Sequence, residues 1–172
     1  MTTPTQPTAL PADGNLRIAW APALTDPKAP KLTELSAASV VDLSCYLTED
    51  GYSPSMDQQM VADSRLCSTS DNERIGRFKD GLDLVYVYQP QADVSATDNK
   101  AFTTLRYRTT GFIVARWGKA FDLPWTVGDI VDVTPAQCGQ QMKNPPEANS
   151  RLRVTQKIGV TSQMLRDVAV VA

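Results

Sequence analysis

The sequence contains no histidine. This absence removes the commonest general base and metal ligand, and with it nucleophile arrangements of the Ser-His-Asp and Cys-His kinds. Cysteine is scarce as well, since Cys45, Cys67 and Cys138 lie far apart and form no Cys-x-x-Cys pair. A disulfide framework or a zinc site is therefore not expected. Reduced thiols in a cytosolic folding compartment are the prediction.

Several other features are missing. No apolar run approaches the roughly 20 residues that a membrane-spanning helix needs, and the first 15 residues hold no apolar stretch of the kind found in signal peptides. Neither a dinucleotide-binding nor a P-loop glycine pattern occurs. The 17 basic and 19 acidic residues give a net charge of −2. Because the basic residues are scattered, the sequence offers no bulk reason to bind nucleic acid.

Carboxylates remain as candidates for acid–base chemistry. Asp80 and Asp83 flank a turn, and Asp129 and Asp132 stand at the start of a strand pattern. Side chains three residues apart in a strand lie on opposite faces, which does not suit a shared acid–base site. Residues 71–83 also lack the spacing of a calcium-binding EF-hand loop. We therefore expect neither an enzyme nor a bound metal or cofactor.

Alternating strand patterns are what the sequence does contain. In the segment RLRVTQKIGV, residues Leu152, Val154, Ile158 and Val160 fall on one face, while basic and hydroxyl residues fall on the other. This period of two predicts a strand with one buried and one solvated face. Comparable patterns cover residues 16–21, 40–47, 56–67, 82–89 and 111–117, and a last strand runs to Ala172.

Breaks between these strands are also predicted. Asp50-Gly51 indicates a turn, and residues 71–83 indicate a mobile hairpin tip. Pro135, inside a strand pattern, indicates an edge strand or a bulge. A single helix is expected from Ser95 to Tyr107, with an apolar stripe facing inward.

Many strands with one helix predict a mainly β fold, a β-sandwich or barrel with one flanking α-helix. Residues 1–15, rich in threonine and proline, are expected to form an extended N-terminal arm, because proline removes backbone donors and disfavours helix in the residue before it. Residues 16–172 are expected to form one domain that ends in a C-terminal strand. Trp125, in a loop-like segment, is predicted to be a packed or an interface residue.

Six segments, in this order and spacing, resemble the tail tube protein (major tail protein) of long-tailed, non-contractile bacteriophages, especially those of actinobacteria. They are VVDLSCYLTEDGY, DQQMVADSRLCS, LDLVYVYQPQ, TTGFIVARWGK, GDIVDVTPAQCGQQ and PPEANSRLRVTQKIGVTSQMLRDVAVVA. The resemblance covers nearly everything beyond the N-terminal arm.

The resemblance implies a fold of two packed sheets with a helix, and a structural role in the virion tail after a cytoplasmic stage in the host. It implies rings, hexameric in such families, that stack into a tube through which DNA passes without specific binding. The tape measure protein and the tail terminator are the further partners that it implies, with no membrane involved.

The resemblance also suggests interface residues. The best match to the loop that contacts the next ring in related tubes is Leu47 to Met56, with Tyr46 and Tyr52 as anchors. Tyrosine suits an interface because it combines a large contact area with a polar tip. Two tyrosines of an ordinary core would show the same pattern.

Three alternatives stay open at this point. Another phage structural β-sandwich, such as a tail terminator or a head decoration protein, would share the scaffold. A carbohydrate-binding module would need a row of exposed aromatic residues. A hydrolase comes last, because histidine and a suitable carboxylate pair are lacking.

Overall fold

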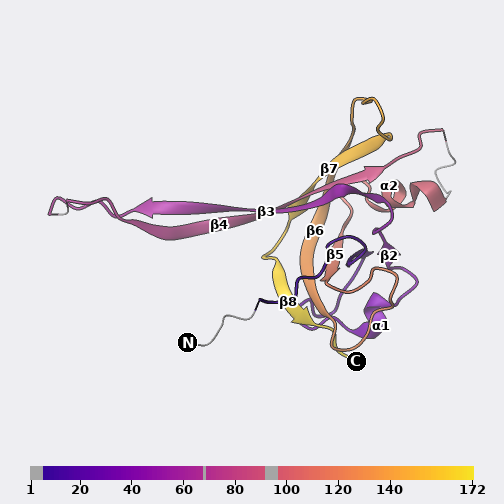
Figure 1. The fold of residues 1–172 in the computed structure, drawn as a ribbon, viewed down its shortest axis with the longest axis horizontal. Helices are drawn as coiled ribbons and strands as arrows, with labels where there is room; N and C mark the ends of the chain where they lie inside the picture. The colour runs from indigo at the N-terminus through magenta and orange to yellow at the C-terminus, as the bar shows by residue number, and fades with distance from the viewer. Residues whose placement is uncertain (1–5, 68, 92–96) are drawn as a thin grey trace. The chain divides into compact units, whose positions relative to one another are not determined.

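The computed structural model describes residues 6–67, 69–91 and 97–172. The fold is mainly β, with 47% of the residues in strands and 7% in helices, which confirms the predicted fold class. Figure 1 labels the elements along the chain. The strands are β1 (Leu16–Ala21), β2 (Val41–Asp42), β3 (Leu47–Ala62), β4 (Glu73–Val87), β5 (Thr110–Trp117), β6 (Ile130–Lys143), β7 (Arg153–Val160) and β8 (Leu165–Ala169), and the helices are α1 (Leu32–Leu35), the 3-10 turn η1 (Thr97–Asn99) and α2 (Lys100–Thr104).

The chain divides into two compact units. The first unit comprises Met1–Cys45, Gly111–Thr134 and Leu165–Ala172, and the second comprises Tyr46–Thr110 and Pro135–Met164. Strand β6 is continuous and contributes its first five residues to one unit and the remainder to the other.

In the first unit, antiparallel pairing joins β1 to β2 and to β5, and joins β8 to β6. Residues 18–21 of β1 and 113–116 of β5 are buried without alternation. Both faces of these two strands are therefore covered, which explains why their sequences are almost continuously apolar.

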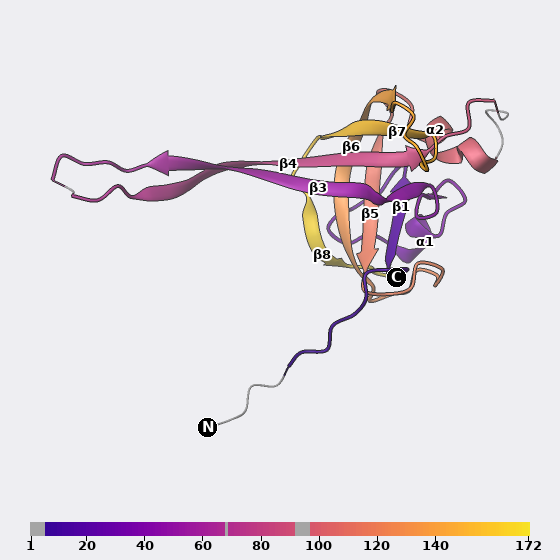
Figure 2. The same cartoon turned by 45° about the horizontal axis from the view of Figure 1, so that its top comes forward.

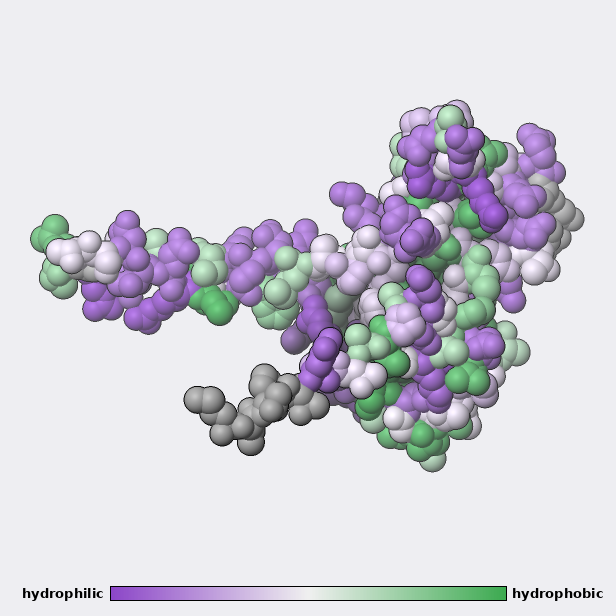
Figure 3. Space-filling view, viewed as in Figure 1, coloured by the Kyte–Doolittle hydropathy of each residue, from purple (hydrophilic) through white to green (hydrophobic). Residues whose placement is uncertain are grey.

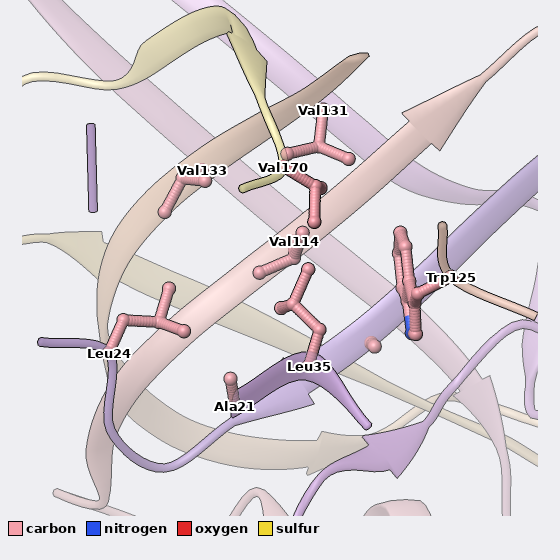
Figure 4. Packing of buried hydrophobic residues seen from close by; sticks show 9 residues of the cluster. Ala21, Leu24, Leu35, Val114, Trp125, Val131, Val133 and Val170 are labelled. Atoms are coloured by element: carbon pink, nitrogen blue, oxygen red, sulfur yellow. The ribbon is translucent and has the colours of Figure 1, made fainter. Parts of the chain in front are cut away.

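The hydrophobic core of the first unit gathers side chains from distant parts of the chain. In Figure 4, Val114 of β5 lies among Leu35 of α1, Val131 of β6 and Val170 near the C-terminus. Helix α1 is only four residues long, and the backbone N–H of Leu32 donates to the carbonyl of Val171 at 2.8 Å. Because so short a helix is not stable in isolation, this packing and tethering must hold it.

In the second unit, β4 pairs with β3 on one side and with β7 on the other, and β7 pairs with β6. Leu82, Leu84 and Tyr86 on alternate positions of β4 are buried. The Tyr86 hydroxyl donates to Gln156 Oε1 at 3.0 Å, and Gln156 Nε2 donates to the carbonyl of Leu105 at 2.7 Å. Burial raises the pKa of the Tyr86 hydroxyl, so this buried donor stays protonated.

The structure corrects two predictions about β3 and β4. Asp50-Gly51 is not a turn, because β3 runs through it and the pairing register shifts between Leu47 and Tyr52, which marks an irregularity of the bulge kind. A Cβ at Gly51 would lie 2.2 Å from the Val85 carbonyl oxygen, so glycine is needed for this close approach. The segment 71–83 is not a hairpin tip either, because most of it belongs to β4.

Three further predictions need adjustment. The segment 40–47 contains only the two-residue strand β2 and the first residue of β3. The expected helix over residues 95–107 is confined to η1 and α2, and residues 95 and 96 lie outside the described residues. Strand β6 is not an edge strand. Its pairing with β8 ends at Val133 and its pairing with β7 begins at Ala136, so Pro135 stands where the partner changes and a missing donor costs little.

The remaining strands agree well with the sequence analysis. Strand β1 has the predicted limits, and β5, β7 and β8 lie within one or two residues of the predicted segments or inside them. Figure 2 shows the same chain from a second direction, with the paired strands β3 and β4 running side by side. None of the helices in the described part of the chain has the length and apolar character needed to cross a membrane.

Candidate functional site

A two-stranded ribbon formed by residues 55–80 is the most unusual feature of the second unit. Strand β4 pairs with β7 only from Leu82 to Val87, whereas its pairing with β3 continues to Glu73. Beyond Leu82 the two strands therefore have only each other as described strand partners, and Figures 1 and 2 show them extending as a long hairpin. An isolated two-stranded hairpin is at best marginally stable in water, so this ribbon depends on further contacts.

One face of the ribbon carries four exposed apolar side chains, and green side chains are visible among purple ones along the ribbon in Figure 3. Cross-strand partners share a face, which places the Met56–Asp80, Gln58–Phe78 and Met60–Ile75 pairs on the same side. Their exposed fractions are 56% for Met56, 45% for Phe78, 52% for Met60 and 76% for Ile75. The same face of β4 carries the buried side chains at positions 82, 84 and 86. The core-facing side of the sheet thus continues into the ribbon, where Asp80 at the base is buried but the four apolar side chains are exposed.

The opposite face of the ribbon is polar. The facing pairs here are Ser55 with Gly81 and Asp57 with Lys79, all at least partly exposed. Next to the apolar Met60–Ile75 pair, Val61 faces Arg74 on this polar side and is 55% exposed. The ribbon is therefore amphipathic, with one face suited to water and one suited to a protein contact.

Side-chain hydrogen bonds and ion pairs connect the two sides of the ribbon. The register shifts near Gly76, where the Gln58 side-chain amide donates to the carbonyls of Gly76 at 3.1 Å and Arg77 at 3.2 Å. A side chain thus satisfies carbonyls that the irregular ladder leaves available. Near the tip, Asp63 accepts from Arg65 and Arg74 at 3.1 and 2.9 Å, but these exposed ion pairs add little stability.

Among the described residues, β3 ends the strand order, so no further strand lies along its outer edge. The Val87 N–H donates toward Tyr46 of the β3 side, and the Tyr88 N–H donates toward Leu152 of the β7 side. The N–H groups of successive residues in a strand point alternately to its two sides, so the Leu82 N–H points toward β7. Pro54, which faces Leu82, therefore directs its nitrogen away from β4 toward the outer edge, where no donor is required. An unpaired edge of this kind is a site where a further strand can add.

A groove of about 680 Å³ lies at the base of the ribbon. Its lining mixes charged residues such as Asp57, Lys79 and Lys157 with Ser162 and Gln163 of the segment that follows β7. Among the described residues no group of three or more Cys, Asp or Glu side chains is arranged to hold a metal ion.

The first unit carries a second unusual feature, a clamped loop from Gly118 to Gly128 between β5 and β6. Arg116 is 1% exposed, and its guanidinium donates to the carbonyls of Ala120 at 2.8 Å, Leu123 at 2.9 Å and Pro124 at 2.9 Å. It also donates to Asp129 Oδ2 at 2.9 Å. One buried side chain thus fixes three backbone carbonyls of the loop.

Trp125 joins this clamp from inside the loop. Its ring lies 4.9 Å from the guanidinium carbon of Arg17 and 5.0 Å from that of Arg116. Arg17 also donates to the Leu123 carbonyl at 2.6 Å and to Asp42 at 2.9 Å. Two cation–π contacts and several charge-assisted hydrogen bonds therefore act on the same few loop residues.

Asp129 holds the C-terminal end of the loop. Its carboxylate accepts from Lys119 Nζ at 2.9 Å and from the Thr126 N–H at 3.0 Å, in addition to Arg116. Burial opposes the charged form, but the hydrogen bonds from Lys119, Thr126 and Arg116 outweigh it and hold the pKa of Asp129 well below its ordinary value. The carboxylate is therefore charged and paired at neutral pH.

The clamped loop presents large apolar side chains to solvent. Phe121, Leu123 and Val127 are 37%, 42% and 56% exposed. Trp117 and Ile130, on the strands that flank the loop, are 52% and 51% exposed. Loops normally expose small polar residues, so apolar side chains on a rigidly held loop suggest a contact surface.

The interface residues predicted from the sequence are dispersed. Tyr46, Leu47 and Tyr52 are half-buried, and the Tyr46 hydroxyl donates to the Thr97 carbonyl at 2.7 Å. Met56 lies on the apolar face of the ribbon. The expected contact loop over residues 47–56 is not a loop, because these residues belong to β3.

Trp125 is 6% exposed and packs inside the first unit. Sequence reasoning missed the clamp around it, for which the sequence offers no local signal. It also missed the second strand of the ribbon, although the alternation of Phe78 and Leu82 with Arg77, Lys79 and Gly81 could have revealed part of it.

Comparison with known proteins adds the family. The sequence model of the family described as "Phage tail tube protein" matches residues 3–172. A solved structure described as "Cryo-EM structure of the anti-feeding prophage (AFP) baseplate, 6-fold symmetrised" contains a similar chain, with a TM-score of 0.53 at 10% identity. The likeness covers 96% of this chain and 98% of that one, and at such identity it shows the fold alone. No curated protein sequence matches.

Proposed function

We propose, since the chain belongs to the phage tail tube protein family, that it assembles with copies of itself into stacked hexameric rings. These rings form the tail tube through which DNA leaves the phage head on infection. The family assigns the chain to the virion tail as a structural protein, and the ring number, the stacking and the passage of DNA are the proposed parts.

The apolar face of the ribbon is the observation that supports self-assembly most directly. Its four side chains Met56, Met60, Ile75 and Phe78 continue the core face of β4 but remain 45% to 76% exposed. Covering a half-exposed side chain of this size contributes about 1 kcal/mol. A neighbouring copy that covers this face would stabilise both the contact and the ribbon itself.

Other partners follow from membership of a tail structure. The tape measure protein and the tail terminator are proposed to contact the assembled tube. DNA is proposed to pass without specific binding, since a net charge of −2 provides no bulk attraction for phosphates. Before assembly the chain is proposed to stay in the host cytoplasm.

Electron microscopy of the purified protein across a concentration series, paired with light-scattering mass, tests the proposal. Hollow tubes of constant diameter and variable length are expected. Closed rings that never stack would favour the tail terminator instead, and a monomer at every concentration would contradict self-assembly.

Paired variants connect this test to the ribbon. Met60→Ser with Ile75→Ser removes one facing apolar pair, and roughly 2 kcal/mol of lost burial would raise the critical concentration about 30-fold. Val61→Ser with Arg74→Ser alters the adjacent facing pair on the polar side and serves as the control. Equal effects of the two double variants would show that the apolar face is not the contact.

A further inference from the structure

In the described part of the chain, most exposed large apolar side chains form two groups, one in each unit. Apart from Tyr107, Met142 and Leu152, they lie either in the ribbon or at the clamped loop and its flanks. The ribbon group is Met56, Met60, Val61, Leu66, Ile75 and Phe78, and the loop group is Leu10, Trp117, Phe121, Leu123, Val127 and Ile130.

The loop group includes the end of the N-terminal arm. The Phe121 N–H donates to the Gly14 carbonyl at 2.9 Å, and the Gly118 N–H donates to the Asn15 carbonyl at 2.8 Å. A Cβ at Gly118 would lie 3.7 Å from the Leu10 side chain. The residues that precede β1 therefore belong to the same surface as the clamped loop.

We propose that the clamped-loop surface of one copy binds the apolar face of the ribbon of a second copy. This inference rests on the proposed function and specifies its contact. The two surfaces are different in sequence and in structure, so pairing one with the other is a heterologous, head-to-tail contact. Contacts of that kind close rings or build open filaments, whereas two identical patches would stop at a dimer.

The areas are compatible with such a contact. With exposed fractions of 37% to 68% in the loop group and 45% to 76% for the four side chains on the apolar face of the ribbon, each surface offers roughly 500 Å², a large part of the ~800 Å² that each partner buries in a specific interface. Neighbouring backbone and polar side chains would supply the rest.

The clamp explains why the loop is the receiving surface. Arg116, Arg17 and Asp129 hold the loop backbone before any partner arrives. Little conformational entropy is then lost in the loop on binding, which favours affinity. The ribbon lacks such support and can adjust to the fixed shape of the loop.

Complementation between two assembly-deficient variants tests the inference. The ribbon variant carries Met60→Ser with Ile75→Ser. The loop variant carries Phe121→Ser with Leu123→Ser, which leaves the Leu123 carbonyl and its hydrogen bonds to Arg17 and Arg116 in place. Circular dichroism and thermal melting verify that each variant is folded, and Met142→Ser with Leu152→Ser is the control outside both groups.

At the concentration where the wild-type protein assembles, neither variant alone is expected to form tubes. A mixture joins the intact loop of one to the intact ribbon of the other, and sedimentation is expected to show a particle of twice the mass of either variant alone. The control is expected to assemble like the wild-type protein.

Each contrary result has a distinct meaning. Tubes formed by the loop variant, or particles whose mass is unchanged by mixing, would overturn the inference while the proposed function stands. Loss of assembly in the control as well would also overturn it, because the effect would not be specific to the two groups. A wild-type protein that never assembles would contradict the proposed function together with the inference.

Discussion

The ribbon and the clamped loop both expose apolar side chains, but their backbones are held in place in different ways. In the ribbon, the strands are held by their own ladder, and the apolar face has no cover. In the loop, a buried guanidinium binds three carbonyls and a carboxylate, so the backbone is fixed although its outer side chains face solvent. One surface is adaptable and the other is preorganised.

This difference shows how exposed apolar area can be tolerated. A rigid loop that cannot rearrange keeps its apolar side chains apart and offers one defined shape to a partner. A long ribbon with a free strand edge is a greater hazard, because it can pair with any strand that approaches. Pro54 at the start of the free edge limits that hazard near the base of the ribbon.

The largest effect is expected from breaking the clamp. Arg116→Gln removes the cation beside Asp129 and one donor from each of the carbonyls of Ala120, Leu123 and Pro124. Loss of one partner of a buried ion pair costs about 3–5 kcal/mol of the free energy of unfolding. Denaturant titration measures this loss, with Arg106→Gln at an exposed position as the control. A change below about 1 kcal/mol would show that the loop is held by other contacts.

Acid is expected to weaken the clamped loop. The folded pKa of Asp129 lies below its unfolded value, so its contribution to stability is complete above about pH 4 and declines as the pH falls toward the folded value. The free energy of unfolding of wild-type protein should therefore decrease below about pH 4. Asp129→Asn should be less stable at neutral pH and show a flatter decrease, and identical pH profiles would contradict this assignment.

A smaller effect is expected from shortening the N-terminal arm. Deletion of Met1–Gly14 removes Leu10 and the Gly14 carbonyl that accepts from Phe121, which should cost about 1 kcal/mol and weaken stacking while the fold remains. Deletion of residues 1–9 keeps both groups and is the matched control. Unfolding of the longer deletion, or tubes formed as readily as before, would contradict the role of the arm.

The smallest effect is a difference in amide hydrogen exchange. In the monomer, edge amides of the ribbon such as Met56 and Gln58 should exchange faster than the Thr126 and Phe121 amides of the loop, which have fixed acceptors. On assembly, the ribbon amides should gain protection and the loop amides should change little. Loop amides that exchange as fast as ribbon amides would contradict a preorganised loop.

The strands were largely predictable, and the candidate site was predictable only in part. β1, β5 and β7 show alternation or continuous apolar residues within a short window, so local pattern was enough. The prediction of a turn at Asp50-Gly51 was wrong, because the sequence does not distinguish a glycine required by a close approach to Val85 from a glycine required by a turn. Of the proposed interface residues, Met56 lies on the ribbon, whereas Trp125 is buried in the clamp.

Alternation along the chain was sufficient for a mainly β fold, because side-chain direction repeats every two residues wherever a strand forms. The lack of histidine was sufficient to exclude nucleophile arrangements of the Ser-His-Asp and Cys-His kinds, because those arrangements need an imidazole. Which alternating faces are covered was decided by tertiary structure, because β7 accompanies β4 only as far as Leu82 and leaves the ribbon bare. The clamp was decided in the same way, since Arg17, Arg116 and Trp125 meet only when the fold brings loop carbonyls to the guanidinium groups.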